Sequence, residues 1–229
     1  MKSQIAAGVQ FEPIARESVE QRVTQALREL IVSGQLEEGT PLVQRDLAQR
    51  LGVSQTPVRV GLSELERDGL VEVGETGRSI VSRLTREDLE EIYAARYGLE
   101  GLAARVGAAA LDDDGIKRMQ KLMGELEKLA KRRDVDAYLR ARWDFHAICY
   151  EASGRARLVA EVERLFWRAE RYNHLVLSTA ARFQRSVRYY HSFLDACEAR
   201  DGNAAERVIH ESVRVAVDDL APSLPSEAE

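Results

Sequence analysis

Residues 45–70, "RDLAQRLGVSQTPVRVGLSELERDGL", decide the fold of the first part of this chain. Leu47 and Leu51 predict a short helix that ends at Gly52, and Ser54 predicts the cap of a second helix. The second helix carries apolar side chains at positions i, i+4 and i+7 and stops at a glycine. Two short helices around a tight turn predict a helix–turn–helix whose second helix exposes a polar face at its start.

The flanking sequence extends this pair of helices to a winged domain. Apolar residues at helical spacing from Val19 to Ile31 predict a preceding helix. The alternating segment 70–84 predicts a two-stranded hairpin with its tip near Glu75 to Arg78. We therefore expect a winged helix–turn–helix domain over residues 16–84 and a flexible arm over residues 1–15, which lack strong periodicity.

After residue 85 the sequence changes to long helical patterns without proline. Thr85 and Asp88 resemble a capping box at the start of this part. Residues 85–220 predict an all-α bundle of about six helices, and residues 221–229 are expected to be a disordered tail. The breaks between helices are expected near residues 111–115, 132–134, 153–155, 178–180 and 200–202. The expected fold class is mainly α.

Composition excludes several classes of protein. The 229 residues carry a net charge of −5, so any nucleic-acid contact must come from a few placed side chains rather than a basic surface. The N-terminus has no apolar run for a signal or a membrane span, which indicates a cytoplasmic protein without a membrane partner. Cys149 and Cys197 lie in apolar helical patterns and form no CxxC pair, so buried reduced thiols are expected.

The exposed face of the second short helix suits the major groove of DNA, where such helices place their N-terminal residues at base edges. Arginine pairs with guanine, glutamine with adenine, and the threonine methyl contacts thymine. The preceding helix and the hairpin tip offer further contacts to phosphates and to the minor groove. Spacing alone leaves open a solvated polar face without a DNA partner. The candidate DNA-binding residues are Arg45, Gln55, Thr56, Arg59, Gly77 and Arg78.

Residues 18–81 resemble the DNA-binding domain of GntR-type bacterial transcription regulators. The stretches that carry this resemblance are "ALRELIVSGQLEEGTPLVQRDLAQRLGVSQTPVRVGLSELERDGLVEV" and "GRSIV". The rest resembles the FCD effector domain of the FadR-like subfamily, through "EIYAARYGLEGLAARVGA", "FHAICYEASG" and "HSFLDACEARDGNAAERVIHESV". The resemblance implies a ligand-responsive regulator, not an enzyme, that binds operator DNA as a homodimer.

The resemblance also implies roles for single residues. In that family the positions of Arg45, Thr56, Arg59 and Gly77 contact the operator. Gln55 stands where the family usually has arginine, so we expect a different preferred operator sequence. Gly61 stands where alanine is common, and a packing reason is expected for it.

Histidines in the C-terminal half raise the possibility of a metal site. His146, His191 and His210 lie on three different predicted helices, and imidazoles from facing helices build metal sites in bundles. The resemblance implies a divalent cation held by these three and by an aspartate four residues before His146. That position is Arg142, so Zn²⁺ or Ni²⁺ is expected to bind more weakly than in an aspartate-containing site. His174 matches no ligand of the family.

An alternative is that the pocket grips an anionic metabolite directly. The resemblance places Arg96 in the cavity, and guanidinium groups bind carboxylates in a bidentate way. Arg96, Arg142 and Asn173 are therefore the candidate effector-binding residues. The structural alternative for Arg96 is an ion pair with Glu100, four residues further along the helix.

Two other classes of function compete with a regulator. Three histidines with an open coordination position are also typical of a catalytic zinc site, so an all-α metalloenzyme is one alternative. A helical scaffold that uses the winged domain for protein contacts is the other. The chain contains no HExxH, GxSxG or phosphate-binding loop, which favours the regulator.

Overall fold

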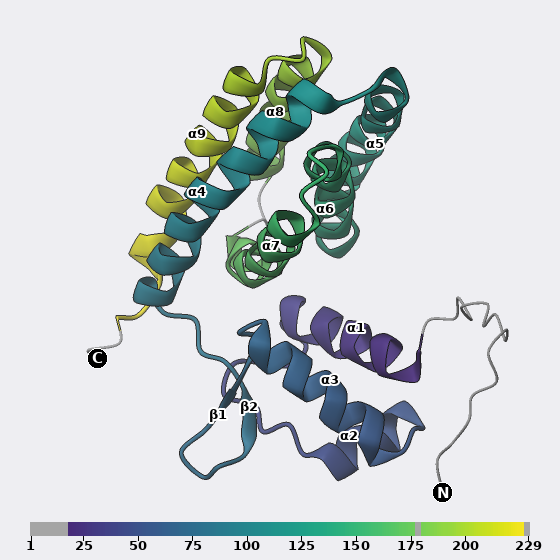
Figure 1. Cartoon of the computed structure of the whole chain (residues 1–229). Coiled ribbons are helices and arrows are strands. Elements are labelled where there is room, and N and C mark those ends of the chain that lie inside the picture. The colour runs from purple at the N-terminus through teal and green to yellow at the C-terminus, as the bar shows by residue number, and fades with distance from the viewer. Residues whose placement is uncertain (1–17, 177–179, 227–229) are drawn as a thin grey trace, which may run out of the picture.

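The computed structural model describes residues 18–176 and 180–226 and contains a winged domain and an all-helical domain (Figure 1). The winged domain consists of α1 Val19–Val32, α2 Gln44–Leu51, α3 Gln55–Arg67, β1 Val71–Val73 and β2 Ser79–Val81. The second domain consists of α4 Arg86–Ala110, α5 Asp113–Arg132, α6 Val135–Ala152, α7 Ala156–Val176, α8 Ala180–Glu198 and α9 Gly202–Leu220. The predicted mainly α fold is confirmed.

Local sequence signals set the elements of the winged domain. The Ser18 hydroxyl accepts the Gln21 backbone N–H, and the Gln21 side chain accepts the Ser18 N–H, which fixes the start of α1. The three helices enclose a core that includes Leu27, Val58 and Leu65. A Cβ on Gly61 would lie 3.1 Å from Oγ1 of Thr24 on α1, which supplies the expected packing reason for glycine.

The wing is a short antiparallel hairpin. Val71 pairs with Val81, and Val73 pairs with Ser79. Gly77 at the tip has a φ of 72°, a left-handed conformation that favours glycine. The hairpin and its tip are therefore where the sequence predicts them.

Polar caps begin several helices of the second domain. Thr85, Asp112, Asp134 and Asp201 each accept the backbone N–H of the residue three positions later, at the starts of α4, α5, α6 and α9. The predicted breaks coincide with the ends of these helices. The break near 178–180 lies mostly outside the described residues.

The tail differs from the prediction. Ala221–Ser223 form a short 3-10 helix, and Ala221 is buried. The Pro225 carbonyl accepts the backbone N–H of Arg86 at 3.0 Å, so the tail packs against the start of α4. The prediction of disorder is wrong for this segment because sequence polarity does not report these backbone contacts. Residues 1–15 and 227–229 lie outside the described part.

Small residues allow α4 to approach its neighbours closely. Figure 1 shows α4 and α9 side by side along the domain. A Cβ on Gly107 of α4 would collide with the backbone carbonyl of Cys149 on α6, and one on Gly202 of α9 would collide with the carbonyl of Arg105. These helices therefore pack backbone against backbone at these two points.

Helix α7 connects the helical domain to the segment that leaves the winged domain. Arg171 donates through Nη1 to the Ser82 hydroxyl and through Nη2 to the Ser82 carbonyl, both at 2.6 Å. The Tyr172 hydroxyl donates to Asp88 at 2.7 Å, and Arg168 forms an ion pair with Asp88. We call residues 82–88 the linker, because they join β2 to α4.

Both cysteines are buried and free, as predicted. Their sulfur atoms, one on α6 and one on α8, lie 3.8 Å apart in the core of the helical domain. Within the described residues, we find no helix that is both long and apolar enough to span a membrane.

Candidate DNA interface and ligand cavity

Helix α2 and the tip of the β1–β2 hairpin lie on the side of the winged domain that faces away from the helical domain (Figure 1), and the candidate DNA-binding residues belong to α2, α3 and the hairpin tip. Gln55 and Thr56 open α3, and Arg59 follows one turn later, all three exposed. Arg45 lies near the start of α2 with its side chain 81% exposed. Gly77 and the exposed Arg78 lie at the hairpin tip. The exposed face of α3 thus has the geometry of a recognition helix.

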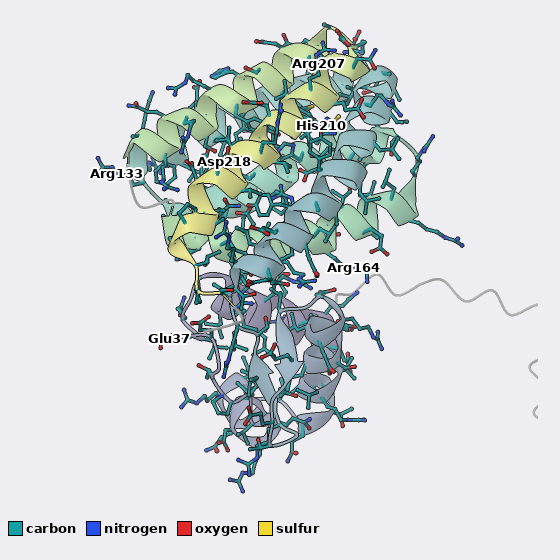
Figure 2. All side chains as sticks on the ribbon, turned by 90° about the vertical axis from the view of Figure 1, so that its left-hand side faces the viewer. Glu37, Arg133, Arg164, Arg207, His210 and Asp218 are labelled. Carbon is teal, nitrogen blue, oxygen red and sulfur yellow. The ribbon has the colours of Figure 1, made fainter. Side chains whose placement is uncertain are left out.

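The three predicted metal ligands do not converge. His146 is buried, and its Nδ1 lies 3.2 Å from the Tyr150 hydroxyl. His191 is exposed, and its Nε2 lies 2.9 Å from a carboxylate oxygen of Glu127 on α5. His210 stacks on Tyr97 with 3.7 Å between ring centroids, near the surface beside α4 (Figure 2).

Helix geometry explains this outcome. One residue turns a helix by about 100°, so the residue before His191, Tyr190, is the one that faces the core. The prediction that His146, His191 and His210 converge is therefore wrong. The described residues contain no group of three or more His, Cys, Asp or Glu side chains that could hold a metal ion.

The surroundings of the buried His146 also disfavour a charged imidazole ring. Burial lowers its pKa to about 3, and the cations of Arg142 and Arg96 act in the same direction, against the effect of Glu100. His146 is thus neutral at physiological pH. A dication beside it would face the guanidinium of Arg142, so the residues present do not fit the expected Zn²⁺ or Ni²⁺ site.

Arg142 is held by a buried network. Its Nε donates to the Tyr190 hydroxyl at 2.6 Å, and its Nη1 donates to Glu170 at 3.0 Å. The Glu170 side chain is fully buried and also accepts from Asn173 at 3.3 Å. Burial would lower the pKa of Arg142, but Glu170 and the neighbouring tyrosines raise it well above its ordinary value. Arg142 therefore remains a cation. Its ion-pair partner is Glu170.

Arg96 has a structural role. Its Nε donates to Glu100 at 2.8 Å, and both side chains are almost fully buried. Glu100 also accepts the Tyr150 hydroxyl at 2.8 Å. Burial would raise the pKa of Glu100, but Arg96 and the other partners lower it. The ion-pair alternative is the one that the structure supports for Arg96.

A cavity of about 590 Å³ lies between α8 and α9. Arg142 and Asn173 line it, whereas Arg96 is not among the described residues of its wall. The apolar part of its wall comes from Val208, Val215, Ala216 and Leu220 of α9. Arg182, Arg185 and Arg207 add cationic groups closer to solvent, and Arg185 pairs with Asp219. A concave apolar site with a few placed polar groups is typical of small-molecule binding.

Sequence reasoning missed Glu170 and Tyr190. Glu170 follows Val162 and Phe166 at four-residue spacing, so it occupies an apolar position of its helix. A carboxylate at such a position signals a buried cation elsewhere in the core. Tyr190 lies directly before His191, and the sequence pattern does not show which of these two neighbours faces the core.

Comparison with known proteins agrees with this architecture. Residues 19–81 match the model described as "Bacterial regulatory proteins, gntR family", and residues 91–214 match the FCD domain. The second match alone covers more than half of the chain. The fold and its two sites define a transcription regulator with a DNA-binding and an effector-binding domain. The chain belongs to the GntR family and carries an FCD domain, which supports the regulator over the metalloenzyme alternative.

Two relatives are similar over most of their length. The regulator McbR of Escherichia coli is 25% identical over 192 residues, which cover 83% of this chain and 87% of McbR. The gluconate operon repressor of Bacillus licheniformis is 25% identical over 217 residues, covering 90% of this chain and 88% of the repressor. The solved structure of McbR has a TM-score of 0.80 at 24% identity, over 90% of this chain and 98% of that chain, and supports the fold.

Proposed function

We propose that this regulator binds a two-fold-related operator as a homodimer and represses transcription until a small carboxylate ligand enters the cavity. A single short recognition helix per chain supports the dimer, because one such module buries too little surface for tight specific binding. The exposed start of α3 supports base contacts by Gln55, Thr56 and Arg59. The name of the B. licheniformis relative supports repression.

The hydrogen bonding of Arg142 is the observation that supports a carboxylate as the ligand. Within the described residues, only its Nε and Nη1 have hydrogen-bond partners. Nη2 is thus left for a group in the cavity that Arg142 lines. A carboxylate suits a guanidinium, and the apolar wall on α9 suits a hydrophobic body. Gluconate, in the name of one relative, is itself a carboxylate.

Operator binding is tested with the DNA that flanks the gene of this protein. We expect a gel shift that weakens steeply with salt, because phosphate contacts release counterions. Arg59→Ala is expected to lose about 1–3 kcal/mol of sequence-selective binding if it contacts guanine. Arg67→Ala, which changes an exposed arginine at the other end of α3, is the matched control. Tight binding by a protein that sediments as a monomer would contradict the dimer.

Ligand binding is tested by calorimetry with benzoate, octanoate and gluconate against the corresponding amides. We expect at least one carboxylate to bind, its amide to bind far more weakly, and Arg142→Gln to abolish the difference. Binding is expected to survive chelator treatment, because the proposed contact is made by a guanidinium. Metal analysis of protein purified without a His-tag is expected to find no stoichiometric Zn²⁺ or Ni²⁺, and a stoichiometric metal that is lost in His146→Ala would contradict this.

A further inference from the structure

Helix α7 presents two opposite faces to two different parts of the molecule. Successive residues turn by about 100°, so Glu170 and Asn173 share one side of the helix. Arg168, Arg171 and Tyr172 lie on the other side and hold the linker. The first face belongs to the network around Arg142, and the second belongs to the connection with the DNA-binding domain. Helix α7 therefore contacts both the network around Arg142 and the linker.

Glu170 already occupies the place that a ligand carboxylate would seek. Its Oε2 accepts from Nη1 of Arg142 at 3.0 Å, and its side chain has no exposed surface. The charges of the two ion pairs around Arg142 are balanced, with Arg96 and Arg142 against Glu100 and Glu170, while His146 is neutral. A carboxylate that enters beside Arg142 adds a third negative charge to this network, which holds two cations. The two carboxylates then compete for one guanidinium.

We infer that a ligand carboxylate displaces Glu170 from Arg142 and that α7 carries this change to the linker. The inference rests on the proposed carboxylate site. The ligand bridges Nη2 and Nη1, since Nη2 has no protein partner within the described residues and Nη1 holds Glu170. Glu170 then shifts with its helix, and the contacts of Arg171 and Tyr172 with Ser82 and Asp88 shift with it.

The side chains on the linker face suit such a relay. Arg171 makes both of its contacts with one residue, the Ser82 hydroxyl and carbonyl. The Ser82 hydroxyl in turn donates to the carbonyl of Gly69, which follows Asp68, the C-cap residue of α3. A displacement of Arg171 is thus two hydrogen bonds away from the C-terminal end of the recognition helix.

Glu170→Gln tests the exchange, because it removes the charge and keeps the shape. We expect this variant to bind the best of the three carboxylates at least five-fold more tightly than wild type. Without any carboxylate, its operator affinity is expected to move in the direction that this carboxylate produces in wild type. Amide exchange in residues 82–88 is expected to accelerate several-fold. Glu163→Gln, an exposed change on the same helix, is the control.

Arg171→Gln tests the relay separately. We expect it to bind the carboxylate as wild type does, while its operator affinity no longer responds to the carboxylate. If Glu170→Gln fails to fold, Glu170→Asp, which shortens the carboxylate by one methylene, takes its place.

The outcomes separate this inference from the proposed function. Tighter carboxylate binding by Glu170→Gln with unchanged operator affinity and exchange would overturn the relay and leave the carboxylate site intact. If neither wild type nor Glu170→Gln binds any of the three carboxylates, the proposed site fails and the exchange with it. In that case, faster exchange in residues 82–88 of Glu170→Gln would show coupling through α7 without a carboxylate ligand.

Discussion

Replacing Arg142 by methionine would leave the Glu170 carboxylate buried without its hydrogen-bonded cation. Removing one partner of a buried ion pair typically destabilises a protein by about 3–5 kcal/mol. Glu170 also loses its 3.0 Å hydrogen bond and keeps only the 3.3 Å contact with Asn173. We therefore expect Arg142→Met to lower the free energy of unfolding of the helical domain by several kcal/mol.

The effect is expected to depend on pH in a defined direction. Burial raises the pKa of Glu170, and Arg142 opposes that rise. In Arg142→Met the folded-state pKa lies still further above the unfolded value. A raised pKa contributes stability at low pH that is lost as pH increases through the folded-state pKa. The loss caused by Arg142→Met should therefore grow as the pH rises above the ordinary pKa of a glutamate, by up to about 1.4 kcal/mol per pH unit.

The double variant Arg142→Met/Glu170→Met separates the pair from the rest of the network. With both charges removed, we expect it to be more stable than either single variant. Tyr190 and Asn173 each lose a partner, which costs about 1 kcal/mol apiece. Urea unfolding followed by tryptophan fluorescence is the assay, because Trp143 and Trp167 both lie in the helical domain.

Arg140→Met serves as the matched control, since Arg140 is an exposed arginine on the same helix. Its effect is expected to stay within about 0.5 kcal/mol. Losses of less than about 1 kcal/mol in both Arg142→Met and Glu170→Met, with effects that simply add, would contradict a coupled buried ion pair.

Three further predictions concern other parts of the molecule. Gln55→Arg should shift the operator preference toward guanine at one base pair per half-site, and identical binding-site logos from a selection experiment would rule out base reading by Gln55. His146→Phe should remove part of the acid sensitivity of the helical domain. The pKa of His146 is about 3 in the folded state, so below pH 6.5 only the unfolded state protonates this ring. The free energy of unfolding of wild type should therefore fall by up to about 1.4 kcal/mol per pH unit below pH 6.5. Parallel wild-type and variant curves from pH 4 to 7 would contradict this. Gly107→Ala should destabilise the protein by about 1–3 kcal/mol, because the new Cβ would meet the backbone carbonyl of Cys149. Gly124→Ala on α5 is the control, because a Cβ there would have no neighbouring atom within 4 Å. Thermal unfolding compares the two variants.

Most of the fold could be predicted because its signals are local. These signals are glycines that end helices, polar residues such as Thr85 and Asp112 that cap helix starts, and the regular spacing of apolar residues. Each of them acts within a few residues. They located the helices of both domains and the hairpin. The predicted disorder was wrong for Ala221–Ser223, because a polar sequence does not reveal a backbone contact such as the one between Pro225 and Arg86.

The ligand site was harder to predict because it depends on the rotation of helices. A shift of one residue separates the buried Tyr190 from the exposed His191, and no pattern in the sequence fixes that angle to better than one residue. Arg142 and Asn173 line the cavity, and their role in effector binding stays a prediction. Their partner Glu170 was missed, because a pair 28 residues apart appears only when α6 and α7 pack together.

The backbone contacts at Gly107 and Gly202 divide the helical domain into a fixed part and a variable part. No side chain separates α4 from α6 or from the start of α9 at these points, so sliding by even a fraction of a helical turn would drive peptide groups into one another. Among the described residues, the cavity wall on α8 and the later turns of α9 contains no glycine in such a backbone contact. Substitutions along this wall can therefore change which ligand the proposed cavity accepts without moving the backbone contacts at Gly107 and Gly202.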